Sequence, residues 1–243
     1  DDVSALISRA KSFINIARTE KINNNPNFII EEASTSVLDG LKRAEKMDSR
    51  QPVIPALIAQ IYIRRFEDGS KQKMYLTEAL ENINKAIKLQ NPAFLSSKDS
   101  YDGRFQKIRA YVHFLYGEYI NNQDSILSYR FAIKNIDERL SLKPDDVASW
   151  KDKAKYHYFA KDLGGAYSSL IRASKLAPND PSIFIDMGII LATNNENGKA
   201  CKDFNRADEM IDKGLSSQNR GVLAKDFKKQ KTRLDPWKKH LGC

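Results

Sequence analysis

Residues 144–177 read PDDVASWKDKAKYHYFAKDLGGAYSSLIRASKLA, and residues 178–211 read PNDPSIFIDMGIILATNNENGKACKDFNRADEMI. The two stretches carry similar residues at six positions that lie 34 residues apart. The matching pairs are Pro144 and Pro178, Trp150 and Phe184, Ala154 and Gly188, Ala166 and Ala200, Leu170 and Phe204, and Ala173 and Ala207. A fixed period of this length is typical of solenoid proteins, in which each helical unit stacks on the next.

Each copy of the pattern predicts two helices joined by a turn. In the first copy, apolar residues at helical spacing predict helices over 147–160 and 166–176. Gly164 and Gly165 are expected to break the chain between these two helices. The small side chain of Ala154, matched by a glycine in the second copy, suits a place where two helices cross closely.

The period and the six matched positions resemble the tetratricopeptide repeat, whose unit is a helix–turn–helix of about 34 residues. The resemblance implies an all-α fold, a right-handed α-solenoid of such repeats with a C-terminal capping helix. Arrays of this family present a concave groove lined by the first helix of each repeat, and most of them act as protein-interaction scaffolds. The chaperone-binding members hold a carboxylate with a clamp of Lys, Asn and Arg. Asp152 and Asp186 stand on the corresponding turns here, so that clamp is not matched.

Three weaker helical pairs precede the two clear repeats, and the whole chain is predicted to form a single superhelical domain, 1–243. The predicted pairs are 3–47, 52–91, 103–143, 147–177 and 181–212, followed by a capping helix over 222–234 that Asp235 and Pro236 end. Breaks are expected at 23–26 and 93–102, which are rich in Asn, Pro and Ser.

Two local departures from the repeat pattern stand out upstream. The turn of the second pair, which includes Asp68, Gly69, Ser70 and the lysines around Gln72, is about eight residues longer than the family spacing. A binding loop and a plain surface loop are both open there, and a surface loop is the more common case. Arg139 takes a position where the pattern has a small residue, so less regular packing is expected around it.

The positive charge of the chain is concentrated at its C-terminal end. The net charge is +9 over 243 residues, and residues 220–243 hold eight Lys or Arg against two Asp, which is +6. The polar, lysine-rich character of 222–234 fits a capping helix, because the last repeat of a solenoid needs a face that water accepts. A basic segment can also meet nucleic acid, acidic protein or anionic lipid.

The sequence shows no pattern for a membrane-spanning helix, a disulfide framework or a targeting signal. No apolar run approaches the roughly 18 residues that a membrane helix needs. Cys201 is expected to be a small half-buried residue, and Cys243, the last residue, to be mobile and unpaired. The chain begins at Asp1 rather than Met, as a fragment or a processed protein does; a removed signal peptide fits this start, and the compartment is left open.

No constellation of catalytic or metal-binding residues is found, so we expect neither enzyme activity, nor a cofactor, nor a metal site. His113, His157 and His240 are far apart in sequence and lack the spacing of zinc ligands. His157 is expected to be packed rather than catalytic. The pair Gly164–Gly165 lacks the spacing of a phosphate-binding loop.

The resemblance places a partner-binding groove on the first helices of the two clear repeats. The residues expected to line it are Lys151, Lys155, Tyr158, Phe159, Ser182, Ile185, Ile189 and Ala192. Two functions follow from these residues. The first is a protein-interaction scaffold that receives a peptide or a partner protein in the groove. The alternative is a binder of nucleic acid or an anionic surface, through the basic C-terminal helix and the groove lysines.

Overall fold

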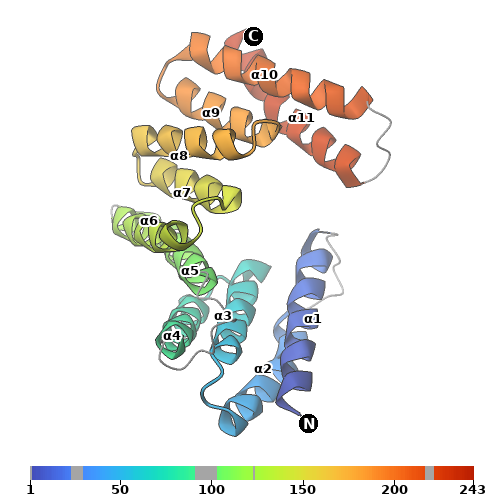
Figure 1. Ribbon diagram of the computed structural model, residues 1–243, viewed down its shortest axis with the longest axis vertical. Helices are drawn as coiled ribbons and strands as arrows, with labels where there is room; N and C mark the ends of the chain where they lie inside the picture. Colours follow the sequence, from blue (N-terminus) through green and yellow to red (C-terminus); the bar gives the residue numbers. More distant parts are fainter. Residues whose placement is uncertain (1, 23–29, 91–102, 123, 217–221) are drawn as a thin grey trace. The chain divides into compact units, whose positions relative to one another are not determined.

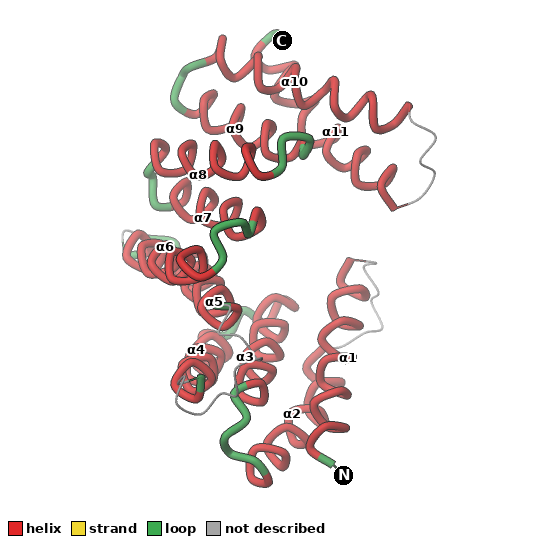
Figure 2. The backbone as a smooth tube through the Cα atoms, in the orientation of Figure 1, coloured by secondary structure: helices red, strands yellow, loops and turns green. Residues whose placement is uncertain are grey.

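The computed structural model describes residues 2–22, 30–90, 103–122, 124–216 and 222–243. Every regular element in these ranges is a helix, and none is a strand (Figure 2). The all-α prediction is therefore confirmed over the described ranges. The contacts divide the chain into two compact units, Asp1–Lys143 and Pro144–Cys243, which we describe one at a time.

The first unit consists of three helical pairs. Its helices are α1 (Val3–Ile22), α2 (Ile30–Met47), α3 (Val53–Arg65), α4 (Lys73–Leu89), α5 (Arg104–Ile120) and α6 (Ser125–Leu142). On α2 the buried residues Ile30, Val37, Leu41 and Ala44 recur three, four or seven residues apart, so they form one apolar face. The breaks predicted at 23–26 and 93–102 lie outside the described residues.

The insertion in the second pair differs from the expected surface loop. Phe66–Ser70 form a wide π-helical turn that continues α3. Phe66 is buried and meets the ring of Tyr119 edge-on, and the Glu67 carboxylate accepts hydrogen bonds from Arg64 and from the hydroxyl of Tyr111. These contacts hold Phe66 and Glu67, at the start of the turn, against the unit, while Asp68, Lys71 and Gln72 are exposed.

Arg139 is buried in α6 at the position where the repeat pattern has a small residue. Gly103 makes the room, because a Cβ there would lie only 3.0 Å from the Arg139 Cα. Gly103 also has a φ of 72°, which glycine adopts without strain. A large residue in one helix is thus accommodated by a glycine at the start of its partner.

The second unit holds the two clear repeats and the C-terminal helix (Figure 1). Its helices are α7 (Val147–Phe159), α8 (Leu163–Leu176), α9 (Pro181–Thr193), α10 (Asn197–Ser216) and α11 (Val222–Leu241). Asp146 caps α7 and Asp180 caps α9 by accepting a hydrogen bond from a backbone N–H of the first turn.

The glycines of the first repeat do not break the chain as predicted. Helix α8 already begins at Leu163, so Gly164 and Gly165 lie inside its first turn. Asp162 explains the earlier start, because its carboxylate accepts the Gly165 N–H at 2.8 Å and caps the helix ahead of the glycines.

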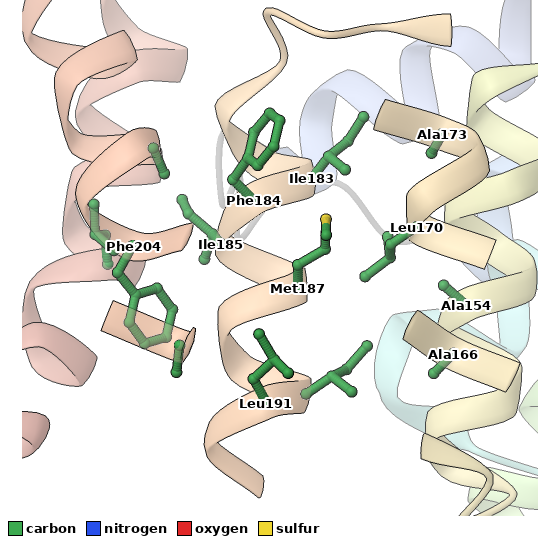
Figure 3. Close-up of a cluster of buried hydrophobic side chains, with 14 of the residues drawn as sticks. Ala154, Ala166, Leu170, Ala173, Ile183, Phe184, Ile185, Met187, Leu191 and Phe204 are labelled. Atoms are coloured by element: carbon green, nitrogen blue, oxygen red, sulfur yellow. The ribbon is translucent and has the colours of Figure 1, made fainter. Parts of the chain in front are cut away.

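The core of the second unit is a cluster of buried apolar side chains from α7 to α11, centred on α9 (Figure 3). Gly188 lets α9 and α10 approach closely, because a Cβ at this position would lie 2.4 Å from Cε1 of Phe204. The close crossing predicted at this slot is confirmed. The same arrangement recurs between Gly117 and the ring of Tyr129 in the first unit.

Helix α11 packs on α9 and α10 but is longer than predicted. It passes through Pro236 and ends at Leu241 instead of residue 234. Proline removes the N–H that would bond to the Thr232 carbonyl, yet both residues are exposed, so water can replace the missing bond. Trp237 folds back and stacks on Phe204 with ring centroids 6.3 Å apart.

The expectation of two unpaired cysteines is wrong. Cys201 of α10 and Cys243 form a disulfide with a Cα–Cα distance of 5.5 Å. The two residues are 42 positions apart in sequence, and only the return of α11 across α10 brings them together.

Candidate functional site

The second unit contains a pocket between α7, α8, α9 and α11, which we call the α7–α9 pocket. Its volume is about 400 Å³. The residues that line it are Lys151, Asp152, Ala154, Lys155, Tyr158, Phe159, Leu170, Asp186, Ile189, Ile190 and Arg233. The pocket is within the range of small-ligand and side-chain sites, which run from about 300 to 1,000 Å³.

The floor of the α7–α9 pocket is apolar. Ala154, Leu170 and Ile190 are buried and belong to the core cluster, while Ile189 is partly exposed. Tyr158 and Phe159 are both partly exposed, and their rings meet edge-on at 5.8 Å. A floor of this kind favours an apolar side chain from a partner, because such a side chain leaves water on entering.

One end of the rim is an ordered polar group around Lys151. Its ammonium donates to the Asp180 carboxylate at 3.0 Å and to the Ser182 hydroxyl at 2.6 Å. Burial opposes ionisation of Asp180, but the hydrogen bonds from Ser182 and Lys151 outweigh it and hold the pKa of this carboxyl below its usual value. Lys151 is thereby fixed in position at the pocket.

Another part of the rim is an ion pair that α11 supplies. The guanidinium of Arg233 lies 2.6 Å from the Asp186 carboxylate of α9. Both side chains are partly exposed, so the pair contributes little to stability, typically below about 1 kcal/mol. Its effect on the pocket is to place one charge of each sign beside the apolar floor.

Five of the eight residues predicted for the groove meet in this pocket. Lys151, Lys155, Tyr158 and Phe159 come from α7, and Ile189 comes from α9. They converge because α7 and α9 are the first helices of consecutive repeats and expose corresponding faces.

The other three predicted residues do not line the pocket. Ser182 is buried and serves as a hydrogen-bond partner of Lys151. Ile185 is fully buried and is one of the core side chains drawn in Figure 3. Ala192 is partly exposed and packs against the same core. A partner that enters the pocket therefore meets Ile189 rather than Ile185.

Sequence reasoning missed Arg233 as a lining residue. The repeat pattern ends with α10, so nothing in the period indicates which face α11 turns toward α9. The apolar residues of α11 are the available signal: Leu234, which is fully buried, and Phe227 and Trp237 pack on the core, and the neighbour of Leu234, Arg233, lines the pocket.

His157 lies outside the pocket and is packed, as expected. Its Nδ1 is 2.7 Å from the Asp162 carboxylate. A Cβ on Gly165 would come within 2.4 Å of both groups, so the glycine allows this contact. The Gly165 N–H, and after it His157, hold the pKa of Asp162 below its usual value. Within the described ranges no three His, Cys, Asp or Glu side chains are placed to hold a metal ion.

The first unit has a smaller hollow of its own, with a volume of about 280 Å³. It lies between α1, α3 and α5, the first helices of the three pairs.

Among the helices that the structure describes, none is both long enough and apolar enough to cross a membrane.

Sequence comparison gives no family. No family profile matches the chain, and no curated protein matches it either.

Structural comparison does give a fold. A fragment of MamA from Desulfovibrio magneticus RS-1, from residue 41 to the end, superposes with a TM-score of 0.56 at 15% identity, over 86% of this chain and 97% of that one. YrrB, described as a TPR protein with an unusual peptide-binding site, gives a TM-score of 0.53 at 16% identity, over 94% and 98% of the two chains. A thermophilic TPR protein of Thermus thermophilus, TTC0263, gives 0.56 at 11% identity, over 92% and 99%. The chain therefore has a tetratricopeptide-repeat-like, all-helical solenoid fold.

Proposed function

We propose that this protein is an interaction scaffold that binds a peptide segment of a partner protein in the α7–α9 pocket. The observation that carries the proposal is the pocket itself, an apolar, aromatic floor of about 400 Å³ with charges of both signs on its rim. The description of YrrB as having a peptide-binding site supports the same class of ligand on this fold.

The pocket chemistry suggests how a peptide would be held. One apolar side chain of the partner would enter beside Ile189 and the rings of Tyr158 and Phe159. Lys155, which is exposed, would meet an acidic or carbonyl oxygen of the partner near this anchor. Recognition would combine burial at the centre with polar contacts at the rim, the usual division in protein interfaces.

The alternative, binding of nucleic acid or an anionic surface through α11, has less support. Three of the basic residues of α11 are already paired with acids of the same unit: Lys231 with Asp208 and Asp212, Lys238 with Asp208, and Arg233 with Asp186. These ion pairs neutralise part of the positive charge of the C-terminal helix. The exposed lysines Lys225, Lys228 and Lys229 are the residues that would serve the alternative.

The test begins with a random peptide library displayed against the immobilised full chain. A selected peptide is then titrated by calorimetry into the wild type and into Ile189→Ser. We expect the affinity to fall at least tenfold, because the substitution removes an apolar contact from the pocket floor. Ile171→Ser is the matched control, since Ile171 is equally a partly buried isoleucine on the same core but does not line the pocket.

Binding measured at raised salt concentration, and binding by a variant that lacks three lysines, distinguish the two proposed functions. Binding that rests on apolar contacts survives a rise in salt, whereas phosphate binding weakens steeply. The triple variant Lys225→Gln, Lys228→Gln, Lys229→Gln should leave peptide binding unchanged. The scaffold proposal fails if no peptide depends on Ile189 while the triple variant abolishes binding of single-stranded RNA or of vesicles with anionic lipid.

A further inference from the structure

Helix α11 closes the second unit by covering the last repeat. Leu234 is fully buried among the core side chains, and the ring of Trp237 lies on Phe204. Phe227 packs on Gly214 so closely that a Cβ on the glycine would lie 2.4 Å from the ring. The helix therefore hides apolar surface of α9 and α10 that would otherwise face water.

Polar contacts hold the middle of α11. Asp208 of α10 accepts hydrogen bonds from both Lys231 and Lys238, the latter at 2.6 Å, and Arg233 reaches Asp186 of α9. Burial opposes ionisation of Asp208, but the two lysines outweigh it and hold the pKa of this carboxyl below its usual value.

The segment of α11 after Pro236 is short and lacks one helical hydrogen bond. Proline removes one backbone hydrogen bond at that point, and Gly242, with a φ of 71°, ends the helix six residues later. A backbone hydrogen bond from the Cys243 N–H to the Lys238 carbonyl, at 3.0 Å, follows the last helical residue. The disulfide from Cys243 to Cys201 of α10 is the covalent connection at this end of the helix.

We propose that Cys201–Cys243 is a redox-modifiable clasp that keeps α11 closed on α9 and α10. The reductant would be a dithiol. One thiolate attacks a disulfide sulfur to give a mixed disulfide and a cysteine thiolate, and the second thiol of the reductant then displaces the other cysteine. The products are two cysteine thiols, after uptake of two protons, and the oxidised dithiol. Reduction releases the segment from Trp237 onward.

Release of this end changes what the second unit presents to a partner. Trp237 leaves Phe204, and the Lys238 contact to Asp208 is lost with it. The neighbouring turn of α11 carries Arg233, which lines the α7–α9 pocket, so opening also loosens one wall of that pocket. The redox state of Cys201 and Cys243 thereby controls the exposure of apolar surface in this unit and the rigidity of one wall of its pocket.

The test compares the oxidised full chain with the same chain after treatment with tris(2-carboxyethyl)phosphine, which like a dithiol takes the disulfide to two thiols. Thiol titration first establishes that the untreated protein has no free thiol. Hydrogen exchange is then followed by mass spectrometry over residues 224–241 and over α9. We expect exchange in 237–241 to become at least tenfold faster on reduction, while α9 amides from Ile183 to Leu191 keep their protection, because the opening is local.

Two variants make the result specific. The double variant Cys201→Ser, Cys243→Ser should show the fast exchange without any reductant, and the reductant should then have no further effect. A Trp150→Phe background leaves Trp237 as the one tryptophan, so its fluorescence should shift to longer wavelength on reduction. Equal exchange in the oxidised and reduced chains, or two free thiols in the untreated protein, overturns the proposal. Neither readout uses a peptide, so the outcome is independent of the proposed function.

Discussion

At the residue scale, the second unit depends on glycines that let an aromatic ring lie directly on a helix backbone. Gly188 under Phe204 and Gly214 under Phe227 are both of this kind. At these positions it is the absence of a Cβ that allows the contact, because the nearest atoms of each ring lie within 3 Å of where that Cβ would be. Any side chain there must displace the ring or push the two helices apart.

The first prediction concerns Gly188. Replacing it with Leu should lower the free energy of unfolding by roughly 2 kcal/mol or more, because overpacking forces Phe204 or the backbone of α10 to move. Gly198→Ala is the matched control, since a Cβ there meets nothing within 4 Å. Urea unfolding followed by tryptophan fluorescence measures both variants. A Gly188→Leu protein as stable as the control would mean that the helix crossing is not where the structure places it.

The second prediction concerns His113 of α5. Burial, and after it the charge of Arg109, lowers the pKa of His113 to about 4, and its ring lies 5.4 Å from that of Phe131. The folded state therefore favours the neutral ring. The neutral His113 ring makes its full contribution to the free energy of unfolding above the unfolded pKa near 6.5. This contribution is lost as the pH falls from there toward 4, and the free energy of unfolding decreases by up to roughly 3 kcal/mol.

His113→Gln removes a group that titrates in this window, so the stability of the variant should vary less between pH 7 and pH 4.5 than that of the wild type. Both tryptophans belong to the second unit, so the measurement must be hydrogen exchange of α5 and α6 amides rather than fluorescence. An unchanged pH dependence would show that His113 is not the group responsible.

At the scale of elements, one carboxylate of α10, that of Asp208, makes two of the polar contacts that add to the apolar packing of α11. Asp208 accepts from Lys231 and Lys238, which are seven residues apart and so lie on the same face of α11. This arrangement explains why a helix with so many lysines can pack against the repeat. The lysines that face α10 are paired, and Lys225, Lys228, Lys229 and Lys239 face solvent.

The third prediction is that Asp208→Asn weakens this attachment. We expect a loss of about 1–2 kcal/mol at pH 7, because hydrogen bonds to charged groups contribute about this much and both lysines lose their common acceptor. Since the pKa of Asp208 is lowered in the folded state, its contribution is present above the unfolded pKa near 3.9 and lost as the pH falls through the folded pKa. Wild type and variant should therefore converge in stability as the pH falls through the lowered pKa of Asp208 in the folded state.

Thermal unfolding of both proteins at pH 7 and at the acid end measures this difference. Asp226→Asn is a suitable control, because Asp226 is an exposed acid on the same helix. A control that costs as much as Asp208→Asn would point to net charge rather than to the two specific contacts.

At the scale of the whole molecule, the second unit contains everything that its own core needs. The buried cluster that includes Phe184, Phe204 and Leu234 draws only on residues from Ala154 to Leu234, and the disulfide lies within the same unit. The first unit likewise packs its own three pairs. A single superhelical domain over 1–243 stays a prediction.

The fourth prediction follows from this division. A fragment of residues 144–243 should fold by itself, with a helical far-UV circular dichroism spectrum and one cooperative melting transition. The complementary fragment 1–143 serves as its counterpart. A fragment 144–243 that melts without cooperativity would show that the two units stabilise each other, as a single continuous array requires.

The helical repeat and most of the α7 face could be predicted from the amino-acid sequence. A period of 34 residues with matched small and aromatic positions has few structural solutions, because each position must fill the same place in successive units. Lys151, Lys155 and Tyr158 follow one another at spacings of four and three residues, so local helix geometry alone puts them on one face.

Contacts between residues of different helices became known from the packing of the helices. Ile185 was expected to line the groove with Ile189, which is four residues away on the same helix. Because this helix is packed on more than one side, Ile185 is buried in the core while Ile189 stays partly exposed. Arg233 reaches the pocket, and Cys243 reaches Cys201, because α11 returns across α10 beyond the end of the repeat. Periodicity describes contacts that recur from one unit to the next. The contacts of a terminal helix occur once, so their positions depend on how that helix packs.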